Sequence, residues 1–274
     1  MNDPARMVEA CRAADAAEAA AYADMYAGAP AGVRTQLGLQ VRAIAGATLL
    51  LAPGLPVPIF NRVIGLGTFE PATQPALDRI LATYADAGVT SHWISVSPAA
   101  QPVELTGWLG ARGLAPPKRA TWAQMGWPDR APPEVRTSLH VETAGAADAV
   151  PFARVVAQAF GMPPVIVDWL AHLVGRPGWQ TYVARKGERI VGGGFVFVQP
   201  PLAWLGLGSV LAEFRGDHGQ LALFAARIAH ARSLGCTSIH TETGEPMGDE
   251  PNPSLANMVR CGFEKIASRV NFAK

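Results

Sequence analysis

Cysteine is scarce in this chain. Cys11, Cys236 and Cys261 form an odd set that contains no C-x-x-C pair. A disulfide scaffold would show an even set, and a structural zinc site would show closely spaced pairs. We therefore expect free thiols, a reducing compartment and no zinc held by cysteine.

An excess of charge of either sign is also missing. Charged residues make up 16% of the chain, and 23 Lys and Arg against 22 Asp and Glu leave a net charge of +1. Proteins that bind nucleic acids or membrane surfaces usually carry a basic stripe. The sequence shows none, so we expect neither a nucleic acid nor a membrane as partner.

Long hydrophobic runs are absent too. No apolar stretch has the length of a membrane-spanning helix, and the first residues lack the apolar segment of a signal peptide. A cytoplasmic location is expected. Hydrophobic residues nevertheless make up 49% of the 274 residues, which suffices for one large core or two ordinary ones.

The spacing of apolar residues, glycine and proline predicts an α/β protein. Helices are expected at residues 4–27, 74–87, 103–112, 146–160, 165–174, 221–234 and 253–261. Strands are expected at residues 62–68, 91–96, 118–127, 138–142, 180–185, 189–198, 202–211, 237–243 and 264–272, and residues 41–51 are β-prone.

The second half of the chain repeats the order of the first. Residues 64–68 read Ile-Gly-Leu-Gly-Thr and residues 205–209 read Leu-Gly-Leu-Gly-Ser. Proline-rich residues 129–136 lie between the halves and are typical of a linker between independently packed cores. We predict a first domain at residues 1–128 and a second at residues 137–274.

The stretch of residues 210–234 is the most informative part of the sequence. A buried strand leads into a loop that contains Gly216 and Gly219, and a helix follows. Unpaired N–H groups at a helix N-terminus favour phosphate binding, and Arg215 would add positive charge. The alternative is an ordinary strand-to-helix turn.

Residues 210–220, Val-Leu-Ala-Glu-Phe-Arg-Gly-Asp-His-Gly-Gln, resemble motif A of the GNAT superfamily of N-acetyltransferases. Residues 252–263 are similar to the family's fourth-helix motif, which is led by Asn and ends in Gly-Phe. With the repeat, the resemblance implies two tandem GNAT-like domains, the first without the phosphate loop. Each would be a mixed, mostly antiparallel twisted sheet flanked by helices. Ala212 and His218 depart from the motif, which usually has Pro and Gly there.

In that family the loop binds the pyrophosphate of acetyl-CoA. The resemblance therefore implies acetyl-CoA as co-substrate, bound only by the second domain, and no metal. Free backbone N–H groups near Val210 and Leu211 are expected to face the thioester. The side chain of His218 either donates to a phosphate or, as we favour, faces solvent. The predicted cofactor-binding residues are Val210, Leu211, Arg215, Gly216, Asp217, His218, Gly219, Gln220, Leu221 and Asn252.

The acid that would protonate the leaving thiolate is less well marked. Met258 stands where the family often has a tyrosine. Ser254 is the predicted substitute, and Asn252, Cys261 and water are the alternatives.

The predicted general base is Glu242, on the strand after the phosphate loop and its helix, with Glu213 as second candidate. The alternative is that Glu242 is a strand-end carboxylate without a catalytic task. His240 shares a strand face with Glu242, but no third ligand is in register, so no metal site is predicted.

The resemblance implies an N-acetyltransferase in which a primary amine of a small molecule or amino-acid-like acceptor attacks acetyl-CoA directly. The alternative is a non-catalytic acyl-CoA-binding or regulatory module. The sequence leaves open whether the protein forms a homodimer.

Overall fold

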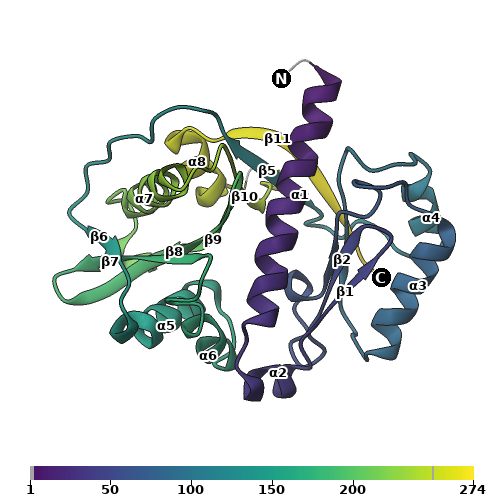
Figure 1. Ribbon diagram of the computed structural model, residues 1–274, viewed down its shortest axis with the longest axis horizontal. Helices are drawn as coiled ribbons and strands as arrows, with labels where there is room; N and C mark the ends of the chain where they lie inside the picture. The colour runs from purple at the N-terminus through teal and green to yellow at the C-terminus, as the bar shows by residue number, and fades with distance from the viewer. Residues whose placement is uncertain (1–2, 249) are drawn as a thin grey trace.

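Eleven strands form one continuous sheet in the computed structural model, which describes residues 3–248 and 250–274 (Figure 1). Their order across the sheet is β1-β2-β3-β4-β11-β5-β10-β9-β8-β7-β6. The strands are β1 (Gln40–Ile44), β2 (Ala47–Leu51), β3 (Arg62–Ile64), β4 (Trp93–Val96), β5 (Thr121–Trp127), β6 (His140–Thr143), β7 (Trp179–Lys186), β8 (Arg189–Gln199), β9 (Leu202–Val210), β10 (Ser238–Gly244) and β11 (Glu264–Phe272). The α-helices are α1 (Pro4–Ala27), α2 (Ala31–Leu37), α3 (Gln74–Asp86), α4 (Leu105–Ala111), α5 (Ala149–Phe160), α6 (Val165–Ala171), α7 (Gly219–Ser233) and α8 (Pro253–Cys261).

Each half of the chain contains one parallel pair of neighbouring strands. β3 runs parallel to β4, and β9 runs parallel to β10. In the chain, α3 connects the first pair and α7 connects the second. The other strand pairs that make up the sheet are antiparallel. The predicted mixed, mostly antiparallel sheets flanked by helices are confirmed.

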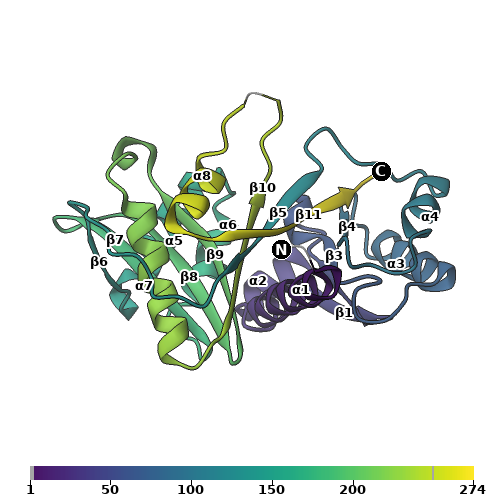
Figure 2. The ribbon, with the colours of Figure 1, turned by 90° about the horizontal axis from the view of Figure 1, so that it is seen from above.

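The two halves exchange their last strands. β5, from the first half, lies between β10 and β11, and β11, from the second half, lies between β4 and β5. Figure 2 shows β11 running from α8 across to β4. The sheet is therefore continuous across the boundary between the halves.

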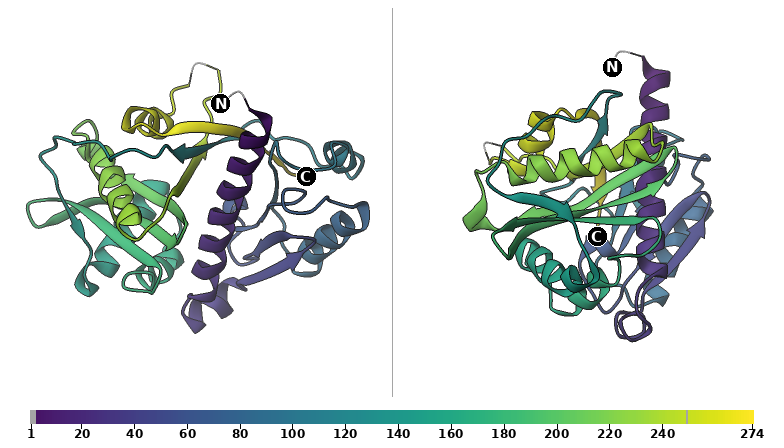
Figure 3. Two further views of the ribbon diagram at one scale, coloured as in Figure 1. Left: turned by 45° about the horizontal axis from the view of Figure 1, so that its top comes forward. Right: turned by 60° about the vertical axis from the view of Figure 1, so that its left-hand side comes forward.

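Helices cover both faces of this sheet. α7 and α8 lie on one face of the second half, and α5 and α6 lie on the other (Figure 1). α1 runs along the joint between the halves (Figures 1 and 3). It contacts β1, β2 and β3 of one half and β9, β10 and β11 of the other, together with the exchanged strand β5.

The hydrophobic cores do not divide at the predicted linker. Met25 and Tyr26 of α1 share a core with Trp169 of α6 and Phe195 of β8. The Trp169 indole N–H donates to the Met25 carbonyl at 2.8 Å. The expectation of independently packed cores is therefore wrong, because α1 packs in one core with residues of both halves. The limits of 1–128 and 137–274 remain a prediction.

The sequence of α1 explains how it fits into this joint. Asp3 caps its N-terminus by accepting from the Ala5 N–H at 3.0 Å, and Pro4 occupies the first turn. Small alanines allow close packing on the sheet, while Asp15 and Glu18 are also buried. A buried carboxylate needs a partner, and the site described below supplies it. No helix of the described residues is long and apolar enough to cross a membrane.

Two short segments differ from their predictions. Residues 41–51 form a hairpin, because Ala45 and Gly46 adopt the left-handed conformation of a tight turn. The strand expected at residues 62–68 ends at Ile64, because Gly65 and Gly67 also have positive φ angles and start a turn.

Candidate functional site

The strands β9 and β10 separate soon after they meet. Their parallel pairing covers three residues of each strand, ending with His240 beside Trp204. Beyond this point β10 stays paired with β5, and β9 stays paired with β8 as far as Val210. A bulge at Leu207, whose φ of 51° is unusual for leucine, turns the β9 backbone further. The sheet is therefore open between these strands.

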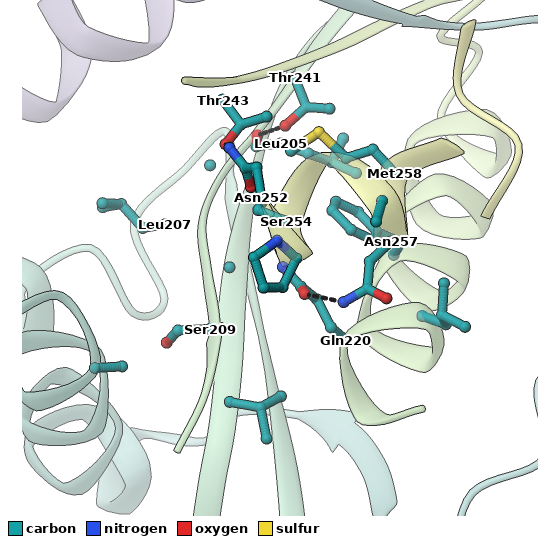
Figure 4. A pocket seen from close by; sticks show the side chains of 18 of the residues that line it. Leu205, Leu207, Ser209, Gln220, Thr241, Thr243, Asn252, Ser254, Asn257 and Met258 are labelled. Atoms are coloured by element: carbon teal, nitrogen blue, oxygen red, sulfur yellow. Dashed lines mark hydrogen bonds between the residues drawn. The ribbon is translucent and has the colours of Figure 1, made fainter. Parts of the chain in front are cut away.

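A cavity of about 570 Å³ fills this opening (Figure 4). One wall consists of α7 and α8, which contribute Gln220, Ser254, Asn257 and Met258. Figure 4 shows these side chains across from Leu207 and Ser209 of β9. The Asn257 amide donates to the Gln220 side-chain oxygen at 2.6 Å and ties the two helices together.

The loop between β9 and α7 closes one end of the cavity. Gly216 has a φ of 94° and His218 has a φ of 53°, so both are left-handed. The first hydrogen bond of α7 joins the Ala222 N–H to the His218 carbonyl, and no side chain of the described residues caps the helix. The N–H groups of residues 219–221 therefore precede the helical ladder and are free to bind an anion.

The opposite end of the cavity reaches Glu242 on β10. Its carboxylate accepts from Arg62 of β3 at 3.0 Å and from Arg269 of β11 at 2.6 Å. Both guanidiniums also contact Glu18 of α1, and Arg269 contacts Asp15 at 3.2 Å. These five residues form a buried ion cluster that joins α1 to both halves of the sheet.

The ion cluster holds three carboxylates and two guanidiniums, so one negative charge is unbalanced when all are ionised. Removal from water penalises that charge. Burial, with the neighbouring charge of Glu18, raises the pKa of Glu242 to about 7, although Arg62 and Arg269 oppose the shift. A carboxylate that titrates near neutral pH and borders a cavity has the properties of a general base.

Several solved structures of other proteins are similar to this chain over most of its length. No family model and no curated protein matches the sequence. A solved GCN5-related N-acetyltransferase from Kribbella flavida aligns over 96% of this chain and 95% of its own, with a TM-score of 0.63 and 16% identity. A second, from Sphaerobacter thermophilus, covers 83% and 80% with a TM-score of 0.59 and 17% identity. A tandem GNAT protein from the clavulanic acid biosynthesis pathway covers 85% and 79% with a TM-score of 0.59 and 18% identity.

The chain has a tandem GNAT fold. The predicted fold class is confirmed. The opening between β9 and β10, with a glycine-containing loop at its end, belongs to the second of the two GNAT-like halves.

In the first GNAT-like half, side-chain and backbone contacts fill the loop that follows β3. The ring of Phe69 covers Gly65, and Gln101 exchanges backbone hydrogen bonds with Gly67 and Ala72. The hydroxyl of Thr73 caps α3 by accepting from the Ala76 N–H at 3.3 Å. The loop is filled and the helix N-terminus is capped. That this half lacks a phosphate loop stays a prediction.

Several predicted cofactor-binding residues have other contacts. The Asp217 carboxylate accepts from the Ser138 N–H, and the exposed His218 ring faces the Arg136 carbonyl at 3.3 Å. The Arg215 guanidinium donates to the Val210 carbonyl at 3.3 Å. Asp217 and His218 hold the loop against residues 136–138. The N–H groups of Phe214 and Arg215 donate to the Leu211 and Ala212 carbonyls, so the free N–H groups lie later in the loop.

The prediction of a free N–H at Leu211 is wrong. This N–H donates to the Val191 carbonyl at 2.8 Å, because the pairing of β9 with β8 continues past Val210. The edge of β9 that faces the cavity lies earlier, from Leu205 to Val210.

Two predicted residues lie at the start of α8. The Asn252 side chain accepts from the Leu255 N–H at 3.0 Å and donates to the Gly244 carbonyl, so it caps α8 and fixes it to the end of β10. Ser254 lines the cavity in the first turn of α8, and Met258 is buried one turn later. Of the alternatives, Glu213 is exposed and pairs with Arg189 at 3.1 Å. In the described part of the chain, no cluster of His, Cys, Asp and Glu could hold a metal ion.

Arg227 on α7 is a cavity residue that sequence reasoning missed. Its fully buried guanidinium donates to the Phe195 carbonyl at 3.1 Å, while its Nη2 has no hydrogen-bond partner in the described residues. A Cβ at Gly194 or Gly208 would lie within 3.0 Å of the guanidinium, so these glycines make room for it. The sequence did contain a signal, since Arg227 lies three residues after Phe224 on the apolar side of the helix.

We expect Gly216→Ala to weaken CoA binding about tenfold or more, because the left-handed loop conformation is strained for any residue with a Cβ. Isothermal titration of CoA measures the affinity. The matched control is Gly235→Ala at the far end of α7, where φ is 84°. It should lower the thermal midpoint similarly and leave the CoA affinity unchanged. Equal CoA affinities for the two variants would contradict the placement of the phosphate loop.

Proposed function

We propose that this protein transfers the acetyl group of acetyl-CoA to a primary amine of a small molecule. The observation that carries the proposal is one cavity, bordered at one end by free N–H groups of the α7 N-terminus and at the other by the buried carboxylate of Glu242. The GNAT fold supports it, since acetyl-CoA is the co-substrate that such a cavity fits.

The residues of the second half would hold acetyl-CoA. The diphosphate would accept from the N–H groups between Gly216 and Leu221, where the helix dipole also favours negative charge. The pantetheine arm would lie along β9 beside Ser209, whose buried hydroxyl has no partner in the described residues. The thioester would then lie where β9 and β10 separate.

The proposed reaction is a direct attack of the neutral amine on the thioester carbonyl. A C–N bond forms, the C–S bond breaks, and the electron pair of that bond leaves on the thiolate. Glu242 accepts the proton that the amine loses. Ser254, a hydroxyl on the α8 wall, delivers a proton to the thiolate and regains one from solvent.

Arg227 would stabilise negative charge as it develops on the thioester oxygen. The guanidinium is buried beside the β9 edge, has no carboxylate partner among the described residues, and keeps one nitrogen unpaired. Burial lowers the pKa of Arg227 to about 10, so it stays cationic at neutral pH. A preorganised donor in a dry site is worth more than the same donor in water.

Arg227→Met is expected to lower kcat/KM about a hundredfold, the usual effect of losing one such donor. The thermal midpoint should stay the same or rise, because a buried cation without a partner is replaced by an apolar side chain of similar length. Arg227→Lys should recover part of the activity, since lysine keeps the positive charge but lacks the planar set of N–H donors of the guanidinium. If the Arg227→Met protein is destabilised but keeps full activity per folded molecule, then Arg227 has a structural role and does not stabilise the thioester oxygen.

The rate should rise with pH through the pKa of Glu242. The ionised form is the base, and the pKa is raised to about 7, so kcat/KM should show an ascending limb near pH 7. Ionisation of the acceptor amine adds a separate limb. Glu18→Gln removes a charge that raises this pKa, so it should move the limb near 7 to lower pH. If the pH profile of kcat/KM is the same in Glu18→Gln as in the parent, the proposed effect of Glu18 on the pKa of Glu242 is wrong.

Two assays on the full chain test the proposal. Calorimetry with CoA should show binding in the micromolar to millimolar range, and thiol release from acetyl-CoA should depend on an added amine. A non-catalytic acyl-CoA-binding module is the second candidate, and it is favoured by Met258, which cannot supply a proton. Such a module would be stabilised by CoA against heat and release no thiol. Absence of CoA binding would overturn both.

A further inference from the structure

The cavity has a second, aromatic wall on the side of α1 and α5. Four aromatic side chains from four different elements line it, together with Ile59: Tyr22 of α1, Trp122 of β5, Phe160 of α5 and Trp204 of β9. This wall and Arg227 lie on opposite faces of the sheet. The bulge at Leu207 is the reason, because it turns Gly206 toward Trp204 and Gly208 toward Arg227.

The aromatic wall has a rigid floor. The six-membered ring of Trp204 lies flat over Gly206, where a Cβ would come within 2.0 Å of two of its carbons. Tyr22 packs edge-on against Trp204, with ring centroids 5.2 Å apart. The guanidinium of Arg62 lies 4.5 Å from the Tyr22 ring centre, on the side of the ion cluster. Tyr22 and Trp204 are buried and packed on each other, so this part of the wall is built in advance of binding.

Charge is distributed unevenly along the cavity. Among the described residues that line it, Glu242 is the only carboxylate. The lining cations are Arg215 on the phosphate loop, Arg260 on α8, and the buried Arg227 on α7. Beside the aromatic wall, the cavity therefore offers the single carboxylate of Glu242 for one amino group. The wall offers neither a second carboxylate for a polyamine nor a cation for an acceptor carboxylate.

We propose that the acceptor is a primary amine on an uncharged apolar skeleton, of the arylalkylamine class. Its amino group would face Glu242, and its ring would lie against Trp122, Trp204 and Phe160, where aromatic pairs add to the burial of apolar surface. This inference rests on the proposed acetyl transfer and names its substrate class.

The first half of the chain thereby gains a role. It supplies Tyr22, Ile59 and Trp122 to the acceptor wall, and the exchange of β5 brings Trp122 beside β10. Both halves would therefore contact the acceptor, while the second half alone would bind the cofactor.

The test is a titration of three amines into the full chain, with and without saturating CoA, followed by calorimetry. The probes are 2-phenylethylamine, the polyamine spermidine and the dicarboxylic amino acid glutamate. We expect 2-phenylethylamine to bind at least about tenfold more tightly than either of the others. Equal or tighter binding of spermidine or glutamate would overturn the proposal.

Variants of the aromatic wall locate the site. Trp122→Ala and Phe160→Ala should each weaken 2-phenylethylamine binding about tenfold and leave the CoA affinity unchanged. Phe160 is 48% exposed, so Phe160→Ala should fold. It therefore serves as the test if Trp122→Ala does not fold. Trp108→Ala, a tryptophan of α4 outside the cavity, is the control. Unchanged binding in Phe160→Ala and in any folded Trp122→Ala protein would overturn the proposal.

The test of the substrate class and the test of the proposed acetyl transfer can fail independently. If CoA does not bind, the acetyl-transfer proposal fails, while the titration without CoA still ranks the amines. If CoA binds and thiol is released with glutamate or spermidine rather than with 2-phenylethylamine, only the substrate class is wrong.

Discussion

Glu242→Gln is expected to lower kcat/KM by about two to four orders of magnitude, the contribution of a positioned general base. Glutamine has the same shape, and its single side-chain oxygen can still accept from one of the two arginines, but it cannot take a proton from the amine. The substitution also removes the unbalanced negative charge of the ion cluster, so the protein should fold. The ascending limb near pH 7 should vanish from the pH profile of the variant.

Glu18→Gln is the matched control for this experiment. It removes a carboxylate from the same ion cluster, but Glu18 does not line the cavity. Activity at alkaline pH should therefore be largely retained, and both variants should bind CoA like the parent. Equal losses of activity in the two variants would show that the cluster, rather than Glu242 as a base, is responsible.

Arg269→Leu is expected to cost about 3–5 kcal/mol of the free energy of unfolding, the usual loss when a buried ion pair is broken. The guanidinium is 1% exposed and contacts all three carboxylates: Asp15, Glu18 and Glu242. Only Arg62 would remain to compensate them. Denaturant unfolding measures the loss, which should shrink as the pH is lowered, because protonation neutralises the orphaned carboxylates.

The control for the stability experiment is Arg119→Leu. Arg119 pairs with Glu250 on the surface, and its side chain is 71% exposed. The unfolding midpoint should hardly change, because exposed ion pairs contribute little. A small loss for Arg269→Leu, comparable with that for Arg119→Leu, would contradict the view that the ion cluster holds the two halves together.

The strand, loop and helix of residues 202–234 could be predicted because their determinants are adjacent in the sequence. Gly216, Gly219 and the apolar turns of α7 set the local geometry, and few distant contacts are needed. The same holds for α8, whose bounds follow from the Asn252 cap and the terminal Gly262. The N–H of Leu211 was predicted wrongly, because its partner Val191 depends on how far β8 and β9 stay paired.

The ion cluster and the aromatic wall could not be predicted in the same way. Asp15 and Glu18 look like the solvated side of an alanine-rich helix until Arg62 and Arg269 are brought to them. The exchange of β5 and β11 is equally hidden, because local patterns predict a strand but not its neighbours. The sequence pointed to Glu242 by its place on the strand that follows the loop and its helix, whereas the physical reason for its raised pKa, burial beside Glu18, depends on the tertiary fold.

A crystal structure of the full chain with bound CoA tests the central claim most directly. We predict that the diphosphate accepts hydrogen bonds from the N–H groups between Gly216 and Leu221, and that the sulfur lies between β9 and β10 on the way to Glu242. A diphosphate bound at residues 65–74 of the first half, or a sulfur on the far side of the sheet from Glu242, would contradict the account.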